Sequence, residues 1–125
     1  MKEHQFTHEK LKSWQLAKYF ARRVYEVTGT YPAAERYSLV DQLRRAAVSV
    51  MSNLAEGSGR TNTRDQAHFS QLAYSSLMET DAQLQLSVDL SYLSETAYRE
   101  LRQTIQELSA AISGLRTAQM KKVNE

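Results

Sequence analysis

The sequence predicts an all-α protein, an antiparallel up-and-down four-helix bundle in which residues 1–125 form a single domain. Four segments carry apolar residues at steps of three and four positions, which is the period of an α-helix. One proline and four glycines are too few breaks for a protein of many strands and turns. We expect helices over residues of about 9–28, 34–56, 64–90 and 95–118, joined by short loops.

The first two predicted helices occupy the first half of the chain. The first has an apolar stripe formed by Trp14, Ala17, Ala21, Val24 and Thr28. Gly29 suits the position just past its end, and Pro32 follows. The second has a stripe formed by Leu39, Leu43, Ala46, Ala47, Val50 and Leu54. We expect Gly57 to end this helix in a left-handed conformation, which glycine adopts at low cost.

The last two predicted helices follow after a polar loop. Thr63 and Gln66 have the spacing of a capping box, so the third helix should begin there. Its stripe is Phe69, Leu72, Ala73, Ser76, Leu77, Thr80 and Leu84. Ser94 can cap the fourth helix, whose apolar residues have the heptad spacing of bundle helices: Tyr98, Leu101, Ile105, Leu108, Ile112 and Leu115. We expect the tail from Gln119 to fray.

The composition excludes several classes of protein. There is no cysteine, which rules out disulfides, thiolate catalysis and cysteine-based zinc sites. No run of apolar residues is long enough to span a membrane, and the N-terminal residues lack the apolar segment of a signal peptide. These features predict a cytoplasmic protein that does not enter a membrane.

Charge is distributed unevenly along the chain. Residues 1–64 contain eleven Lys and Arg against six Asp and Glu, whereas residues 65–125 contain five against eight. The net charge of the whole chain is only +2. A basic first half suits an anionic partner or the acidic half of a neighbouring copy, and the charge alone does not choose between these.

The apolar surface of the first predicted helix is wider than a bundle requires. It covers roughly 220° of the helix circumference, whereas a core-facing stripe needs about 100–160°. The third predicted helix also has apolar side chains outside its main stripe. One interpretation is that amphipathic tyrosines lie along the surface. We favour contact with other subunits, through an interface that includes Leu16, Phe20, Val27, Tyr74 and Met78.

The stretch LRRAAVSVMSNLAEGSGR begins at Leu43 and has two interpretations. In the favoured one it is structural, because Arg44 and Arg45 diverge by about 100° on a helix and the small residues allow close neighbours. In the alternative, Arg60, Arg64 and the first amides of the third helix form a phosphate cradle. A nucleotide P-loop is excluded because the pattern G-x-x-x-x-G-K-[ST] is absent.

Metal and catalytic sites have little support in the sequence. His4 and His8 are four residues apart but have no third ligand nearby, and Asp65 with His68 is half of a motif that di-iron bundles need twice. No spacing of Ser, His and Asp suggests a nucleophile. We therefore expect no catalytic residue, no metal and no cofactor, and a protein that is not an enzyme.

The densest part of a resemblance to a known family is RRAAVSVMSNLAEG, which begins at Arg44, preceded by Gln42 and Leu43. Further matching residues are Trp14, Ala17, Thr28, Tyr31, Pro32, Glu35, Tyr37, Leu39, Phe69, Ala73, Ser76, Leu77, Glu79, Leu84, Leu90, Tyr92 and Leu93. The chain resembles the small four-helix-bundle proteins encoded by intervening sequences of bacterial 23S rRNA genes. That family includes relatives of the accessory variability protein of diversity-generating retroelements. Met51 departs from the pattern, because the family usually has proline there, so the helix should keep an amide hydrogen bond at this point.

The resemblance implies a homopentamer, and the retroelement relatives are thought to bind nucleic acid and a reverse transcriptase through a basic surface. We therefore expect an oligomer that binds RNA or DNA backbone, with a reverse transcriptase or another protein as a further partner. The candidate phosphate-binding residues are Lys18, Arg22, Arg23, Arg36, Arg44, Arg45, Arg60 and Arg64. The alternative is a structural or adaptor oligomer that acts through protein–protein contacts and binds no nucleic acid.

Overall fold

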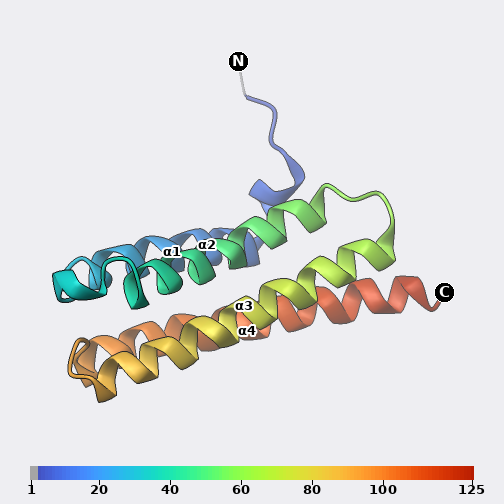
Figure 1. Cartoon of the computed structure of the whole chain (residues 1–125). Helices are drawn as coiled ribbons and strands as arrows, with labels where there is room; N and C mark the ends of the chain where they lie inside the picture. Colours follow the sequence, from blue (N-terminus) through green and yellow to red (C-terminus); the bar gives the residue numbers. More distant parts are fainter. Residues whose placement is uncertain (1–2) are drawn as a thin grey trace.

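The computed structural model describes residues 3–125, which form a four-helix bundle without strands (Figure 1). The helices are α1 (Lys12–Thr28), α2 (Leu39–Ser58), α3 (Thr63–Asp89) and α4 (Glu95–Val123), with short 3-10 helices η1 (Thr7–Lys10) and η2 (Ala33–Glu35). Both α1 and α3 pack against α2 and α4. Consecutive helices run antiparallel, so the predicted fold class is confirmed.

The bundle consists of two layers, one formed by α1 and α2 and the other by α3 and α4 (Figure 1). The α1–α2 and α3–α4 connections lie at one end, and the α2–α3 connection lies at the other. At the first end the rings of Tyr31 and Tyr92 are 5.6 Å apart, and the Tyr92 hydroxyl donates to the Glu35 carboxylate over 3.3 Å. These contacts fix the two connections to each other.

Every helix contributes side chains to one continuous core. The largest fully buried side chains are Phe20, Leu43, Leu54, Leu77, Leu84, Leu101, Leu108, Ile112, Val24, Val50, Thr80 and Ser87. The buried hydroxyls among them are satisfied within their own helix. Thr80 donates to the Ser76 carbonyl over 2.7 Å, and Ser87 donates to the Gln83 carbonyl over 2.8 Å. These two hydroxyls therefore need no polar partner from outside their helix, whereas the buried Tyr31 hydroxyl has no hydrogen-bond partner among the described residues.

A polar link joins α3 to α4 beside this core. The Tyr98 hydroxyl donates to the Asp81 carboxylate over 2.7 Å and accepts from the Arg102 guanidinium over 2.9 Å. Burial and the hydrogen bond to Asp81 raise the pKa of the Tyr98 phenol. The phenol therefore stays protonated at neutral pH and connects an acidic residue of α3 to a basic residue of α4.

Three helix boundaries differ from those predicted. The first helix begins at Lys12 rather than near residue 9, because Leu11 is extended (φ −81°, ψ 122°). The second begins at Leu39 rather than near residue 34, because residues 33–35 form η2 within the turn that reverses the chain. The fourth continues to Val123 rather than fraying at Gln119, whose side-chain oxygen accepts a hydrogen bond from Ser70 over 2.7 Å.

The prediction for Gly57 is wrong. This residue lies inside α2, is buried, and does not have a positive φ. A Cβ atom on Gly57 would lie 2.8 Å from the Cβ of Phe69 and 3.4 Å from the carbonyl oxygen of Gln66. Glycine is therefore needed here because α2 and α3 approach each other closely, and not because of its conformational freedom.

The cap of α3 also differs from the predicted capping box. Asn62, and not Thr63, precedes the helix, and its side-chain oxygen accepts from the amides of Arg64 and Asp65 over 2.9 and 3.2 Å. The fourth helix begins as predicted, with the Ser94 hydroxyl accepting from the Ala97 amide over 3.1 Å. Both are ordinary side-chain caps of helix N-termini.

Candidate nucleic-acid interface

The two layers of the bundle differ in net charge, because charge is unevenly distributed along the chain. The basic first part of the sequence supplies α1 and α2, and the acidic second part supplies α3 and α4. The helices of each layer are neighbours in the bundle (Figure 1), so residues 12–58 bring an excess of basic over acidic residues to one layer. The bundle is therefore polarised, with one layer suited to an anionic partner.

Within the basic layer, cations and aromatic rings lie together on the outside of α1 and the adjoining part of α2. We call this surface the basic–aromatic face. Its members are Trp14, Lys18, Tyr19, Arg22, Tyr25 and Arg44. The five members on α1 run from Trp14 to Tyr25, eleven residue steps that correspond to about 16 Å along the helix axis. The face is therefore an elongated surface and not a point-like site.

Two cations of α1 lie against rings of the same helix. The ammonium nitrogen of Lys18 is 5.5 Å from the Trp14 ring centroid, and the guanidinium carbon of Arg22 is 5.6 Å from the Tyr19 centroid. Together with Gln15 these four residues line a shallow depression of about 370 Å³. Tyr19 is 43% exposed. A ligand from solvent therefore reaches both the rings and the charges.

Arg44 extends the face from α1 onto α2. Its guanidinium carbon lies 4.5 Å from the ring centroid of Tyr25, and its Nε donates to the Thr28 hydroxyl over 3.0 Å. A weaker bond of 3.4 Å runs from its terminal nitrogen to the Tyr25 carbonyl. Tyr25 still exposes 46% of its surface, so the ring is held in place while much of it faces solvent.

The two adjacent arginines diverge as predicted. Arg44 points toward α1, whereas the Nε of Arg45 lies 2.9 Å from the Asp41 carboxylate on the exposed side of α2. Both line a wide depression of about 670 Å³ that also includes Tyr25 and Asn53. They border the same surface without forming one clamp.

The remaining predicted cations are more scattered. Arg23 pairs with Glu26 and also reaches Glu100 of α4 over 3.8 Å, which directs it away from α2. Arg60 pairs with Glu56 over 2.9 Å and lies over the Phe69 ring, near the α2–α3 connection. The structure thus gathers Lys18, Arg22 and Arg44, with Arg36 and Arg45 nearby, but separates Arg23, Arg60 and Arg64 from them.

The phosphate cradle proposed for the α2–α3 connection is not formed. It requires free amides at the start of α3, but those of Arg64 and Asp65 are bonded to the Asn62 side chain. It also requires Arg60 to face the anion, whereas that guanidinium pairs with Glu56. Arg64 has no carboxylate partner among the described residues. The structural interpretation of this stretch therefore fits the geometry better.

The apolar residues predicted at a subunit interface have different surroundings. Phe20 is fully buried in the core, so its assignment to an interface is wrong. Leu16, Val27 and Tyr74 are half-buried and pack against the core, and Met78 is 38% exposed. The wide apolar surface of the first helix is largely explained by α1 packing against both α2 and α4.

Two groups of exposed residues were not predicted. Leu86 of α3 and Leu90, the residue just after α3, are 47% and 46% exposed, and Leu72, which was assigned to the apolar stripe of this helix, is 37% exposed. Leu86 and Leu90 are four residues apart and lie outside the main stripe of the helix. This spacing indicates a second apolar strip on the surface. At the N-terminus an aromatic series runs through His4, Phe6, His8 and Trp14, with ring centroids separated by 5.5, 6.2 and 4.7 Å. This series depends on the turn made by η1, which periodicity does not reveal.

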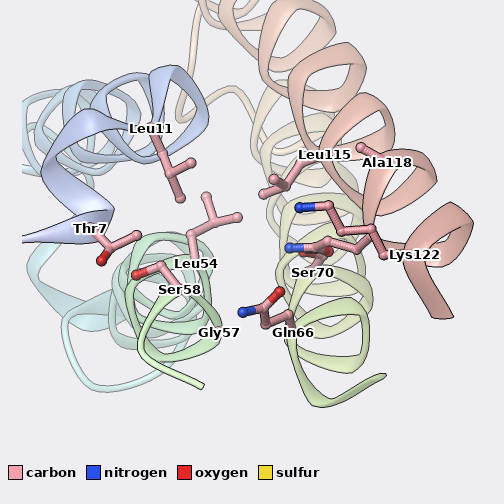
Figure 2. Close-up of a pocket in the computed structure, with 11 residues that line it drawn as sticks. Thr7, Leu11, Leu54, Gly57, Ser58, Gln66, Ser70, Leu115, Ala118 and Lys122 are labelled. Atoms are coloured by element: carbon pink, nitrogen blue, oxygen red, sulfur yellow. Dashed lines mark hydrogen bonds between the residues drawn. The ribbon is translucent and has the colours of Figure 1, made fainter. Parts of the chain in front are cut away.

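The described residues also contain a small pocket at the end of the bundle where α2 ends (Figure 2). Its volume is about 190 Å³, and apolar side chains such as Leu11, Leu54 and Leu115 line it beside Lys122. Sites for small molecules usually occupy about 300–1,000 Å³, so this pocket is smaller than a typical ligand site.

Within residues 3–125, no three His, Cys, Asp or Glu residues lie close enough to hold a metal ion.

A family model described as 23S rRNA-intervening sequence protein matches residues 9–114. The chain belongs to this family. Its fold is similar to a crystal structure of a protein of unknown function from the S23 ribosomal protein family of Bacteroides thetaiotaomicron VPI-5482, with a TM-score of 0.75 and 17% identity over 83% of this chain and 97% of that one. A comparison with curated proteins gives no match. Among the described helices, none has both the length and the hydropathy needed to cross a membrane.

Proposed function

We propose that this member of the 23S rRNA-intervening sequence protein family is a non-enzymatic cytoplasmic protein that binds RNA or DNA through its α1–α2 layer. The observation that carries the proposal is the gathering of Lys18, Arg22 and Arg44 on one elongated face of the bundle. Cations spread along a surface suit the evenly repeated charges of a nucleic-acid backbone. The binding uses phosphate contacts and no readout of base edges.

The ion pairs in this layer leave its cations available to phosphate. Lys18, Arg36 and Arg44 have no carboxylate partner among the described residues. Arg22 and Arg45 pair with acidic residues of their own helix, but their side chains are 71% and 78% exposed. Such exposed pairs stabilise by only about 0–1 kcal/mol, so a phosphate can replace the carboxylate at little cost.

Removing two charges from the face should weaken binding of all sequences alike. Lys18→Gln combined with Arg22→Gln should lower the slope of log K against log salt by about one to two, because each lost phosphate contact removes about 0.7–0.9 from it. The slope can be measured by fluorescence anisotropy with a labelled RNA or DNA over a series of salt concentrations.

A matched pair of charges outside the layer controls for net charge. Arg99 and Lys121 are exposed residues of α4. Arg99→Gln combined with Lys121→Gln removes the same charge and should change the slope much less. Equal losses in the two double variants would mean that binding does not depend on the basic–aromatic face.

We further propose that the protein is a homo-oligomer, with five copies as the expected number. Exposed apolar side chains on α3 and at its C-terminal end support self-association, namely Leu72, Met78, Leu86 and Leu90. Light scattering should give a mass near five times that of the 14.3 kDa chain. A mass near that of one chain at micromolar concentration contradicts self-association, and another multiple contradicts the pentamer alone.

The opposite charges of the two layers favour one second candidate, an adaptor oligomer in which the basic layer of one copy meets the acidic layer of another. In that case the Lys18 and Arg22 double variant loosens the oligomer, by under about 1 kcal/mol for each exposed pair. Nucleic-acid binding would then be absent from the wild-type protein. Sizing and anisotropy on the same samples separate the two candidates.

A further inference from the structure

Phosphate binding alone does not account for the aromatic members of the basic–aromatic face. Tyr19 and Tyr25 expose 43% and 46% of their surface, and Trp14, which also packs against the core, lines the same depression as Tyr19. Each of these rings has a cation beside it. The exposed rings of Tyr19 and Tyr25 are not needed to fill the core, and rings next to cations are the features that bind unpaired nucleotides in many proteins.

We propose that this face stacks unpaired bases, so that the partner is a single-stranded nucleic acid, RNA or DNA, rather than a duplex. The proposal rests on the proposed function and specifies its ligand. In a duplex the base faces are covered by their neighbours, and only a single strand can place a base on Trp14, Tyr19 or Tyr25 while its phosphates meet Lys18 and Arg22. Recognition of RNA most often uses such unpaired segments, with stacking on aromatic rings and guanidinium planes.

The geometry of the face suits a strand lying along α1. The rings from Trp14 to Tyr25 are distributed over about 16 Å, with a cation near each of them. The N-terminal series continues the rings beyond Trp14, through His8 and the 62% exposed Phe6. A second copy of the chain, which would bring its acidic α3–α4 layer to the same cations, is the alternative occupant, and the titrations with RNA below distinguish the two.

The ring contribution can be tested with two double variants. Tyr19→Leu combined with Tyr25→Leu keeps apolar side chains but removes the flat rings. Affinity for a short single-stranded RNA should fall about fivefold to a hundredfold for each ring that stacks, and phenylalanine at both positions should restore most of it. Affinity for the same RNA paired with its complement should start weaker and change little.

The single tryptophan of the chain gives a second readout. A base stacked on Trp14 should quench its fluorescence, whereas inorganic polyphosphate, which carries charge but no bases, should bind with much less quenching. Equal quenching by the two ligands, or equal losses of single-strand and duplex affinity in the leucine variant, would overturn stacking. Salt-dependent binding that persists in that case leaves the phosphate-binding function intact. If neither RNA nor polyphosphate binds, both proposals are overturned.

Discussion

Phe20→Ala should lower the free energy of unfolding by about 3–5 kcal/mol, the usual cost of removing a buried phenylalanine ring. The Phe20 side chain is fully buried in the core formed by all four helices. Truncation removes its contacts and leaves a cavity that rigid helices fill only in part. For a domain of this size such a loss is a large share of the total stability. Urea unfolding followed by circular dichroism measures it.

Tyr37→Ala is the matched control for Phe20→Ala. Tyr37 is 87% exposed and lies outside the apolar surface proposed for self-association, so its truncation should cost about 1 kcal/mol or less in the same experiment. The concentration dependence of unfolding distinguishes the core from a subunit interface. A Phe20→Ala protein that unfolds like wild type but dissociates more readily on dilution would place Phe20 between subunits and contradict the structure.

Gly57→Ala should destabilise the bundle by about 1–2 kcal/mol, because the cost of overpacking exceeds the gain in helix propensity. The new methyl group would lie 2.8 Å from the Cβ of Phe69, an atom that cannot move without shifting the backbone of α3. The two helices must therefore separate locally. Thermal unfolding of the variant should show a lower midpoint than wild type.

Gly114→Ala provides the opposite case in the same protein. Gly114 lies in α4, is exposed, and has no atom within 4 Å of the position that a Cβ would take. Alanine there should raise stability by about 0.5–1 kcal/mol through helix propensity alone. If Gly57→Ala stabilises the protein as Gly114→Ala does, the close approach of α2 and α3 is not needed for folding.

The fold could be predicted because the helical period is clear in every segment. The heptad residues of the fourth helix illustrate this, since Leu101, Ile105, Leu108 and Ile112 are all buried. The period does not say which neighbour a residue meets. Phe20 was placed outside the core because a single narrow stripe of the first helix was assumed to face it. In the structure α1 packs against both α2 and α4, so a wider part of its surface is buried.

The role of Gly57 could not be predicted from the sequence either. A glycine near the end of a helical pattern is most often a C-terminal cap, and this general preference led to the wrong prediction. Its actual role depends on Phe69, twelve residues later in the next helix. Only the packing of α2 against α3 reveals that contact.

The basic residues of the candidate site could be predicted from the sequence, but the contacts that they make could not. Counting Lys and Arg identified the basic half of the chain, and helical geometry separated Arg44 from Arg45. The position of Arg44 over Tyr25 joins two helices, and it follows from the length of the turn between them. Surface tyrosines on the first helix were one interpretation of the sequence, whereas the pairing of each ring with a cation became visible only in the structure.

The most direct test of phosphate binding by the α1–α2 layer is the affinity of the wild-type protein for single-stranded RNA as a function of salt. Three contacts, one for each cation of the basic–aromatic face, give a slope of about −2 in log K against log salt, at about 0.7 for each contact. Affinity should then fall about 20-fold for each subunit between roughly 50 and 200 mM salt. No binding at about 50 mM salt, or an affinity that does not change with salt, would contradict the proposed function.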